Sequence, residues 1–203
     1  EFGEPVQAVE RYRQILDIDA AHPLTREALE GLSRREETLM LATDVLSVVY
    51  RQEGRSDLLA ALYERRLATP GELVRRRDDH AALARVYEDG LRDLTAAFGA
   101  WARLLVEQPE DAEAQKELPR LAEKTGAFER LTRIYETVID DTVDPQRVRT
   151  FAMKAGRVAE FGMVDLGAAT KHYRRALELG GEEPRALAEL ERIYRQEGQW
   201  REL

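Results

Sequence analysis

Glycines that are able to end helices recur at a fixed interval along this chain. Gly54, Gly126 and Gly198 lie 72 residues apart, and glycine most readily adopts the left-handed conformation that closes a helix. A second set of positions keeps the same interval: Asp93 and Asp165, Ala97 and Ala169, Trp101 and Tyr173, and Leu105 and Leu177. Unrelated helices would not hold two sets of marks in phase. The interval therefore predicts an internal repeat, each unit holding two helix pairs of about 36 residues.

Apolar residues between these marks follow the 3.6-residue period of amphipathic helices. No segment alternates apolar and polar residues between turn signals, as a half-buried strand does, so we expect an all-α fold. The expected helices cover residues 5–18, 24–35, 37–53, 56–68, 73–90, 93–107, 111–125, 128–140, 146–161, 165–179 and 184–197.

The segment 83–109 carries the most informative motif, with Leu-Ala-x-x-Tyr in one helix, Ala-x-x-x-Trp in the next, and then Pro109. The first-helix spacing recurs at Leu46/Tyr50, Leu83/Tyr87, Leu118/Ala122, Ala155/Ala159 and Leu190/Tyr194. The second-helix spacing recurs at Ala8/Tyr12, Leu59/Tyr63, Ala97/Trp101, Leu131/Tyr135 and Ala169/Tyr173. With these motifs in register over almost its whole length, the chain resembles the tetratricopeptide repeat family.

The resemblance implies an α-solenoid, a right-handed superhelix of antiparallel helix hairpins, as a single array over residues 1–203. The expected parts are a half repeat at 1–23, an extra helix at 24–35, helix hairpins at 36–71, 72–109, 110–143 and 144–181, and an incomplete repeat at 182–203. Both ends fall inside a hairpin, which indicates a fragment of a longer repeat protein.

Three features depart from the family pattern. The family's proline falls in its usual place only at Pro109, and the hairpins at 83–109 and 155–181 carry one extra residue between their helices. Pro119 lies inside a first helix, where it removes a backbone hydrogen bond. We therefore expect a bend near Gln115–Pro119.

Composition argues against several functions. The net charge is −8, so nucleic acid is not an expected partner. No apolar run approaches the ~18 residues of a membrane span, so we expect no membrane insertion. The expected location is the cytoplasm. The chain has no cysteine, and His22, His80 and His172 lack metal-site spacing, so we expect surface histidines and no metal. No catalytic constellation or phosphate loop appears, which indicates a non-enzyme without a cofactor.

In tetratricopeptide arrays the first helices line a concave groove, and the resemblance assigns that role to 37–53, 73–90, 111–125, 146–161 and 184–197. The candidate groove residues on these helices are Val48, Arg51, Arg85, Glu88, Arg120, Arg157, Glu160, Arg192 and Arg195. The arginines could form a basic ladder for an acidic or extended peptide, because guanidinium groups bind carboxylates in a forked geometry. Alternatively, Arg85, Arg120 and Arg157 pair with glutamates three residues later in their own helices.

The resemblance thus implies a scaffold for protein–protein interaction that holds a protein or peptide partner in this groove. Two alternatives remain open. The chain could be a structural segment that self-associates through its ends, where Val6, Tyr12, Ile15 and Trp200 would otherwise lack neighbours, or the regulatory arm of a larger multidomain protein.

Seven aromatic residues at repeat-packing positions are expected in the core: Tyr50, Tyr63, Tyr87, Trp101, Tyr135, Tyr173 and Tyr194. Trp101→Ala should therefore lower the free energy of unfolding by about 3–5 kcal/mol, because loss of a large buried side chain leaves a cavity. Chemical denaturation of both proteins measures the difference. An unchanged thermal midpoint would contradict the buried placement of Trp101.

Overall fold

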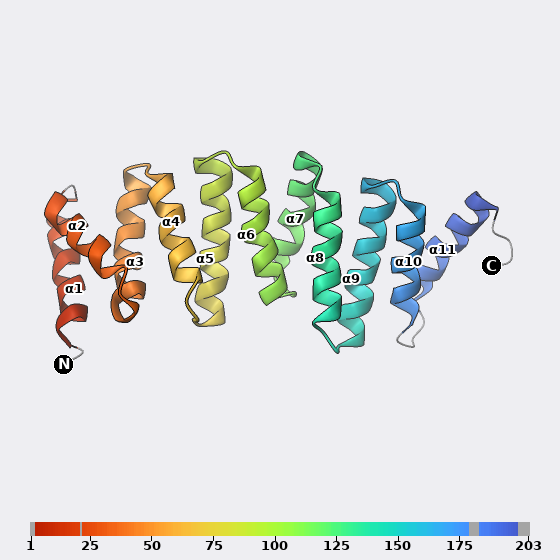
Figure 1. Ribbon diagram of the computed structural model, residues 1–203, viewed down its shortest axis with the longest axis horizontal. Helices are drawn as coiled ribbons and strands as arrows, with labels where there is room; N and C mark the ends of the chain where they lie inside the picture. The colour runs from red at the N-terminus through yellow and green to blue at the C-terminus, as the bar shows by residue number, and fades with distance from the viewer. Residues whose placement is uncertain (1–2, 21, 179–182, 199–203) are drawn as a thin grey trace. The chain divides into compact units, whose positions relative to one another are not determined.

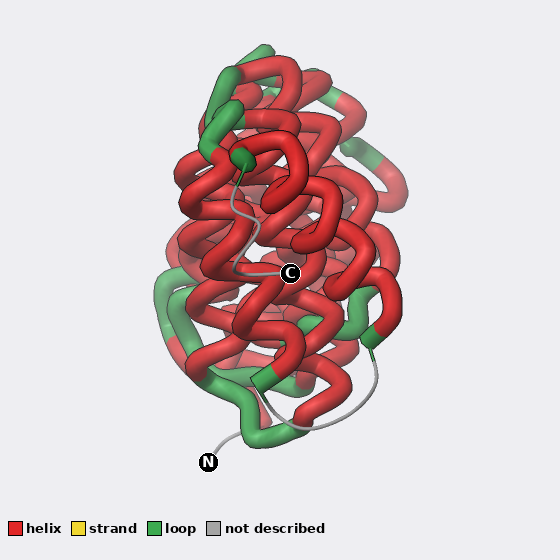
Figure 2. The backbone as a smooth tube through the Cα atoms, turned by 90° about the vertical axis from the view of Figure 1, so that its right-hand side faces the viewer, coloured by secondary structure: helices red, strands yellow, loops and turns green. Residues whose placement is uncertain are grey.

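The computed structural model describes residues 3–20, 22–178 and 183–198, and these residues form helices joined by turns, with no strand among them (Figure 1, Figure 2). The expectation of an all-α chain is confirmed for these residues. The α-helices are α1 (Gly3–Ile18), α2 (Pro23–Leu32), α3 (Glu36–Gln52), α4 (Ser56–Leu67), α5 (Leu73–Arg85), α6 (Leu94–Glu107), α7 (Ala112–Thr125), α8 (Phe128–Asp140), α9 (Pro145–Arg157), α10 (Leu166–Leu177) and α11 (Pro184–Glu197). Two π-helical turns, η1 (Val86–Gly90) and η2 (Val158–Gly162), continue α5 and α9.

The chain divides into two compact units, residues 1–100 and 101–203, and the division falls within α6. In the first unit α1, α2 and α3 pack against one another, α3 packs against α4, and α4 packs against α5 and η1. In the second unit each helix from α7 to α11 packs against the next, and η2 packs against α8 and α10. Figure 1 shows the hairpins formed by α3 with α4 and by α9 with α10.

The helix limits differ from the expected ones mostly by one or two residues, which is the usual scatter at helix ends. The extra segment forms the separate helix α2, which packs on both α1 and α3. His22 caps α2, because its Nδ1 accepts a hydrogen bond from the Thr25 amide at 3.3 Å. The expected turn of a further helix at Trp200 lies outside the described residues.

The repeat-packing positions form the core. The first-helix marker residues Leu46, Leu83, Leu118, Ala155 and Leu190 are all buried. Six of the seven expected aromatics are also buried: Tyr50, Tyr63, Trp101, Tyr135, Tyr173 and Tyr194. Tyr87 is half-buried and donates a hydrogen bond to Glu64 Oε1 at 3.1 Å. Six of the seven aromatic positions therefore belong to the core.

The extra residue in two of the hairpins is absorbed by the π-helical turns, which occupy equivalent positions 72 residues apart. Insertion of one residue into an α-helix produces such a turn. The backbone around η1 and η2 repeats closely: Leu91 N donates to Val86 O at 3.0 Å and Met163 N to Val158 O at 3.1 Å, while Asp93 N donates to Tyr87 O at 2.8 Å and Asp165 N to Ala159 O at 2.9 Å. The residues that follow, Arg92 and Val164, have φ of 56° and 57°.

A glycine ends each π-helical turn because the start of the preceding helix, α4 or α8, approaches it closely. A Cβ atom on Gly90 would lie 2.2 Å from Ser56 Oγ, at the start of α4. A Cβ on Gly162 would lie 2.5 Å from Cδ1 of Phe128, at the start of α8. Ser56 and Phe128 are themselves 72 residues apart, so the same close contact is made in both units.

Helix α7 continues through Pro119. Proline has no amide hydrogen, so the carbonyl of Gln115 loses its helical partner. The Gln115 side chain is also engaged, because it donates to Pro109 O and accepts from Lys154 Nζ at 2.6 Å. The bend near Gln115–Pro119 stays a prediction.

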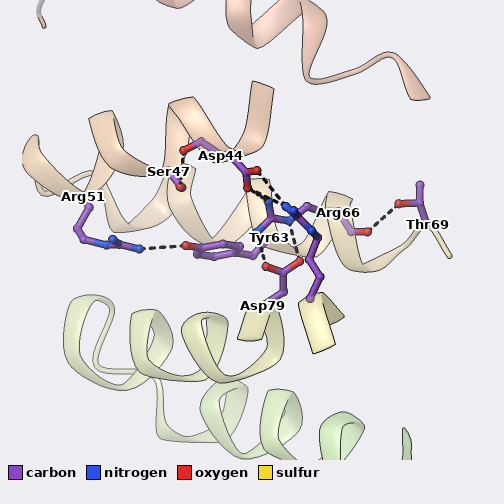
Figure 3. A network of polar contacts seen from close by, with 8 residues as sticks. Asp44, Ser47, Arg51, Tyr63, Arg66, Thr69 and Asp79 are labelled. Carbon is purple, nitrogen blue, oxygen red and sulfur yellow. Dashed lines mark hydrogen bonds and ion pairs between the residues drawn. The ribbon is translucent and has the colours of Figure 1, made fainter. Parts of the chain in front are cut away.

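A buried ion-pair network joins three helices of the first unit (Figure 3). The guanidinium group of Arg66 on α4 binds both carboxylate oxygens of Asp79 on α5, and it donates to Asp44 Oδ1 on α3 at 2.6 Å. The side chains of Arg66 and Asp79 are only 6% and 5% exposed. Arg75 donates to Asp44 Oδ2 at 2.9 Å. Each buried charge therefore has a partner, which a buried ion needs to offset its lost hydration.

The second unit fills the same position with apolar side chains. Val138 and Phe151 stand 72 residues after Arg66 and Asp79, and both are buried. The ring of Phe151 lies 5.6 Å from that of Tyr135, at a tilt of 55°, a favourable arrangement for an aromatic pair. The same two backbone positions thus carry an ion pair in the first unit and apolar side chains in the second.

Gly162→Ala should destabilise the protein by about 1–3 kcal/mol, because the added methyl group forces the Phe128 ring to move. Gly31→Ala is the control: no atom lies within 4 Å of its Cβ position, and replacing glycine inside a helix stabilises by roughly 0.5–1 kcal/mol. Urea denaturation measures both. If the two substitutions shift stability equally, the close contact at Gly162 does not constrain the turn.

Arg66→Val alone should cost about 3–5 kcal/mol, because it leaves the Asp79 carboxylate buried without the guanidinium. Adding Asp79→Phe reproduces the residues of the second unit, and the double variant should recover most of that loss. Equilibrium denaturation of wild type and both variants tests this. A double variant no more stable than the single one would contradict the equivalence of the two positions.

Candidate functional site

Pockets lie between successive first helices in each unit. In the first unit, the α3–α5 pocket is bounded by α3, the start of α4, and α5 with η1, and it has a volume of about 560 Å³. In the second unit, the α7–α9 pocket is bounded by α7, α8, and α9 with η2, and its volume is about 460 Å³. The α9–α11 pocket, of about 440 Å³, follows on the other side of α9.

The α3–α5 and α7–α9 pockets are equivalent sites. Eight of the ten residues that line the first have a counterpart 72 residues later that lines the second. Four of these pairs keep the residue type: Leu59/Leu131, Arg85/Arg157, Val86/Val158 and Gly90/Gly162. Both pockets therefore combine a small aliphatic floor, the glycine of a π-helical turn, and an exposed arginine at the rim.

The other four pairs change the chemistry of the pocket. They are Arg51/Glu123, Ser56/Phe128, Ala82/Lys154 and Asp89/Phe161. At two of these positions a polar residue of the first unit, Ser56 or Asp89, is replaced by a phenylalanine. Each pocket has two cations, which are Arg51 and Arg85 in the first unit and Lys154 and Arg157 in the second. Phe161 is 66% exposed although it is aromatic.

Two cations on α9 line both second-unit pockets. Lys154 is half-buried, donates to Gln115 Oε1 at 2.6 Å, and has its Nζ 5.0 Å from the centre of the Phe151 ring. Burial lowers the pKa of the Lys154 amine. Arg157 is exposed and forms no ion pair with another residue of the described ranges. Its charge is therefore open to a ligand.

Only some of the expected groove residues line the pockets between first helices. Arg51 and Arg85 line the α3–α5 pocket, and Arg51 also donates to the Tyr63 hydroxyl at 3.1 Å. Arg157 lines both second-unit pockets. Val48 is 50% exposed and lines a different groove, between α1 and α3. The remaining candidates do not line these pockets: Glu88, Arg120, Glu160, Arg192 and Arg195.

Pairing of arginines within their own helices occurs, and for Arg120 the partner is not the expected Glu123. Arg120 binds Glu117, three residues before it, with Nε 2.5 Å from Oε2. Arg195 pairs with Glu191 in the same way. Two members of the expected basic ladder are thus neutralised locally.

The expected Arg157–Glu160 pair does not form. Glu160 is buried and accepts hydrogen bonds from Arg192 on α11 and from the Tyr173 hydroxyl, the latter at 3.1 Å. Because η2 adds a residue to the turn, Glu160 does not follow Arg157 at the spacing of a regular helix. Arg192 therefore joins two hairpins, and Arg157 is left at the pocket rim.

The expectation of surface histidines is wrong for two of the three. His80 and His172 are 1% and 6% exposed. His172 Nε2 lies 3.6 Å from Glu136 Oε1, and burial lowers the pKa of His172 despite that carboxylate. Within the described ranges, no group of three acidic or histidine side chains could hold a metal ion.

Sequence reasoning missed Lys154, Phe161 and the groove between α1 and α3. That groove has a volume of about 850 Å³ and an apolar wall that includes Val6, Leu41 and Val48. A usable signal was present for the first two, since aligning the chain on itself at 72 residues places Lys154 opposite Ala82 and Phe161 opposite Asp89. The α1–α3 groove had no such signal, because the repeat is interrupted there.

Comparisons with known proteins leave the site unassigned. No helix in the described part of the chain is long and apolar enough to cross a bilayer. No protein-family model matches the chain, and no curated protein matches it significantly.

Proposed function

We propose that this chain is a non-enzymatic, tetratricopeptide-like scaffold, with the first helices of its hairpins forming a groove that holds an extended segment of a partner protein. One observation carries the proposal: the α3–α5 pocket recurs 72 residues later as the α7–α9 pocket, with an arginine at the rim of each. A repeated pocket suits a ligand that is itself a repeating backbone with variable side chains.

An extended peptide fits the arrangement in the second unit. The α7–α9 and α9–α11 pockets share Lys154 and Arg157, so one continuous ligand can occupy both. About six residues of extended chain span roughly 20 Å, enough to pass across α9 with side chains directed into each pocket. A compact small molecule would need only one of them.

The partner segment is proposed to be acidic. Guanidinium groups bind carboxylates through two parallel hydrogen bonds, and Arg157 has no ion pair with another described residue. The overall charge of −8 disfavours a long polyanion such as nucleic acid, so recognition rests on local pairing. The scaffold is further proposed to act in the cytoplasm.

Charge reversal of Arg85, Arg120 and Arg157 to glutamate should lower partner binding at least tenfold. The variant loses both pocket arginines, Arg85 and Arg157, and each lost charge-assisted hydrogen bond to the partner is worth about 1.5–3 kcal/mol. Immobilised protein is incubated with extract of the native cell, and captured proteins are identified and quantified by mass spectrometry. The matched control reverses three exposed arginines on second helices, Arg11, Arg133 and Arg175, and should retain the same partners. Circular dichroism verifies that both triple variants stay helical. Equal capture by the two variants would exclude the groove as the binding surface.

A further inference from the structure

Two of the four changed positions make the α7–α9 pocket more aromatic than its equivalent. Where the first unit has Ser56 and Asp89, the second has Phe128 and Phe161. Phe128 is held against the glycine of η2, since a Cβ on Gly162 would meet its ring. Phe161 extends from the same turn and is 66% exposed. An exposed aromatic ring at the mouth of a pocket is a common anchor for an apolar ligand group.

Positive charge lies beside this apolar surface. Lys154 and Arg157 belong to the pocket lining, and Glu123 on α7 is the one acid among the lining residues. Lys154 is oriented by Gln115 and by the Phe151 ring, with no ion pair to another described residue. Arg157 is likewise without one. Two cations facing a single exposed carboxylate leave a net attraction for a negative group next to the aromatic surface.

Resting on the proposed function, we propose that the α7–α9 pocket binds a large apolar side chain of the partner segment, while a carboxylate one or two residues away binds Lys154 and Arg157. The α3–α5 pocket has two cations of its own, Arg51 and Arg85, but it has Ser56 and Asp89 in place of the two phenylalanines, so it does not share the preference for an apolar side chain. The volume of about 460 Å³ lies in the range of side-chain and small-ligand sites, roughly 300–1,000 Å³. The two units therefore select different residues of a partner.

A phage-displayed library of random dodecapeptides, selected on the full chain, tests the preference. Enriched sequences should carry Phe, Trp, Tyr or Leu within two positions of Asp or Glu. The strongest sequences are then synthesised with a fluorescein label, and fluorescence anisotropy measures their dissociation constants. A second set replaces their acidic residues by the matching amides, and a third replaces the apolar residue by alanine.

Phe161→Ser should weaken the labelled peptides at least tenfold, and it should have little effect on the alanine-substituted set. Arg157→Gln should weaken the acidic peptides at least tenfold and leave the amide set unchanged. Each substitution in the protein should matter only when the peptide retains the side chain that it is proposed to contact. This coupling distinguishes direct contact from a general loss of structure. Controls of the same type are Val143→Ser, which replaces a fully exposed apolar residue, and Arg133→Gln on α8; both should bind as wild type does.

The outcomes separate this inference from the proposed function. Enriched peptides that lack the acidic–apolar pairing, or that bind Phe161→Ser and Arg157→Gln as tightly as wild type, would overturn the inference and leave the scaffold role intact. Failure to enrich any peptide, combined with equal capture of cell proteins by the triple variant and its control, would overturn both.

Discussion

A helix pair of this size has an apolar face that only the neighbouring helices of the same unit can cover. That constraint explains why the marker positions of the first helices are buried without exception, from Leu46 to Leu190. It also explains the role of the π-helical turns. They add one residue to a first helix without breaking its packing, because Gly90 and Gly162 let the start of the preceding helix, α4 or α8, lie against the turn. The pockets between first helices exist because that contact fixes where each helix ends.

The same structural position is stabilised by two different kinds of interaction. In the first unit Arg66 and Asp79 are buried as an ion pair that also reaches Asp44. In the second unit Val138 and Phe151 occupy the corresponding positions, and the Phe151 ring packs against that of Tyr135. Buried ion pairs seldom stabilise more than well-packed apolar groups, so the ion pair is better understood as fixing the register of three helices. The first unit thus joins its helices at this point by directional ion pairs, whereas the second unit joins them by apolar packing.

The proposed recognition of an extended partner is based on a repeating backbone with changing side chains. The α3–α5 and α7–α9 pockets keep their arginine, glycine and aliphatic residues, which are the groups set by the repeat. The four positions that differ alter charge and aromatic content, so each unit presents its own chemistry on the same framework. Arg192 shows that a charged residue on a first helix can instead be structural, because it binds the buried Glu160 of the preceding hairpin.

The amino-acid sequence by itself determined the helices, the interval of 72 residues and the burial of six of the seven aromatic positions. These properties follow from local helical period and from motif spacing, which are written along the chain. The tertiary structure alone decided which charges pair. Glu160 binds Arg192 rather than Arg157, His80 and His172 are buried, and Lys154 and Phe161 meet in one pocket. Those outcomes depend on the rotation of each helix about its axis and on the added residue in η2. The spacing of motifs along the sequence does not specify either of them.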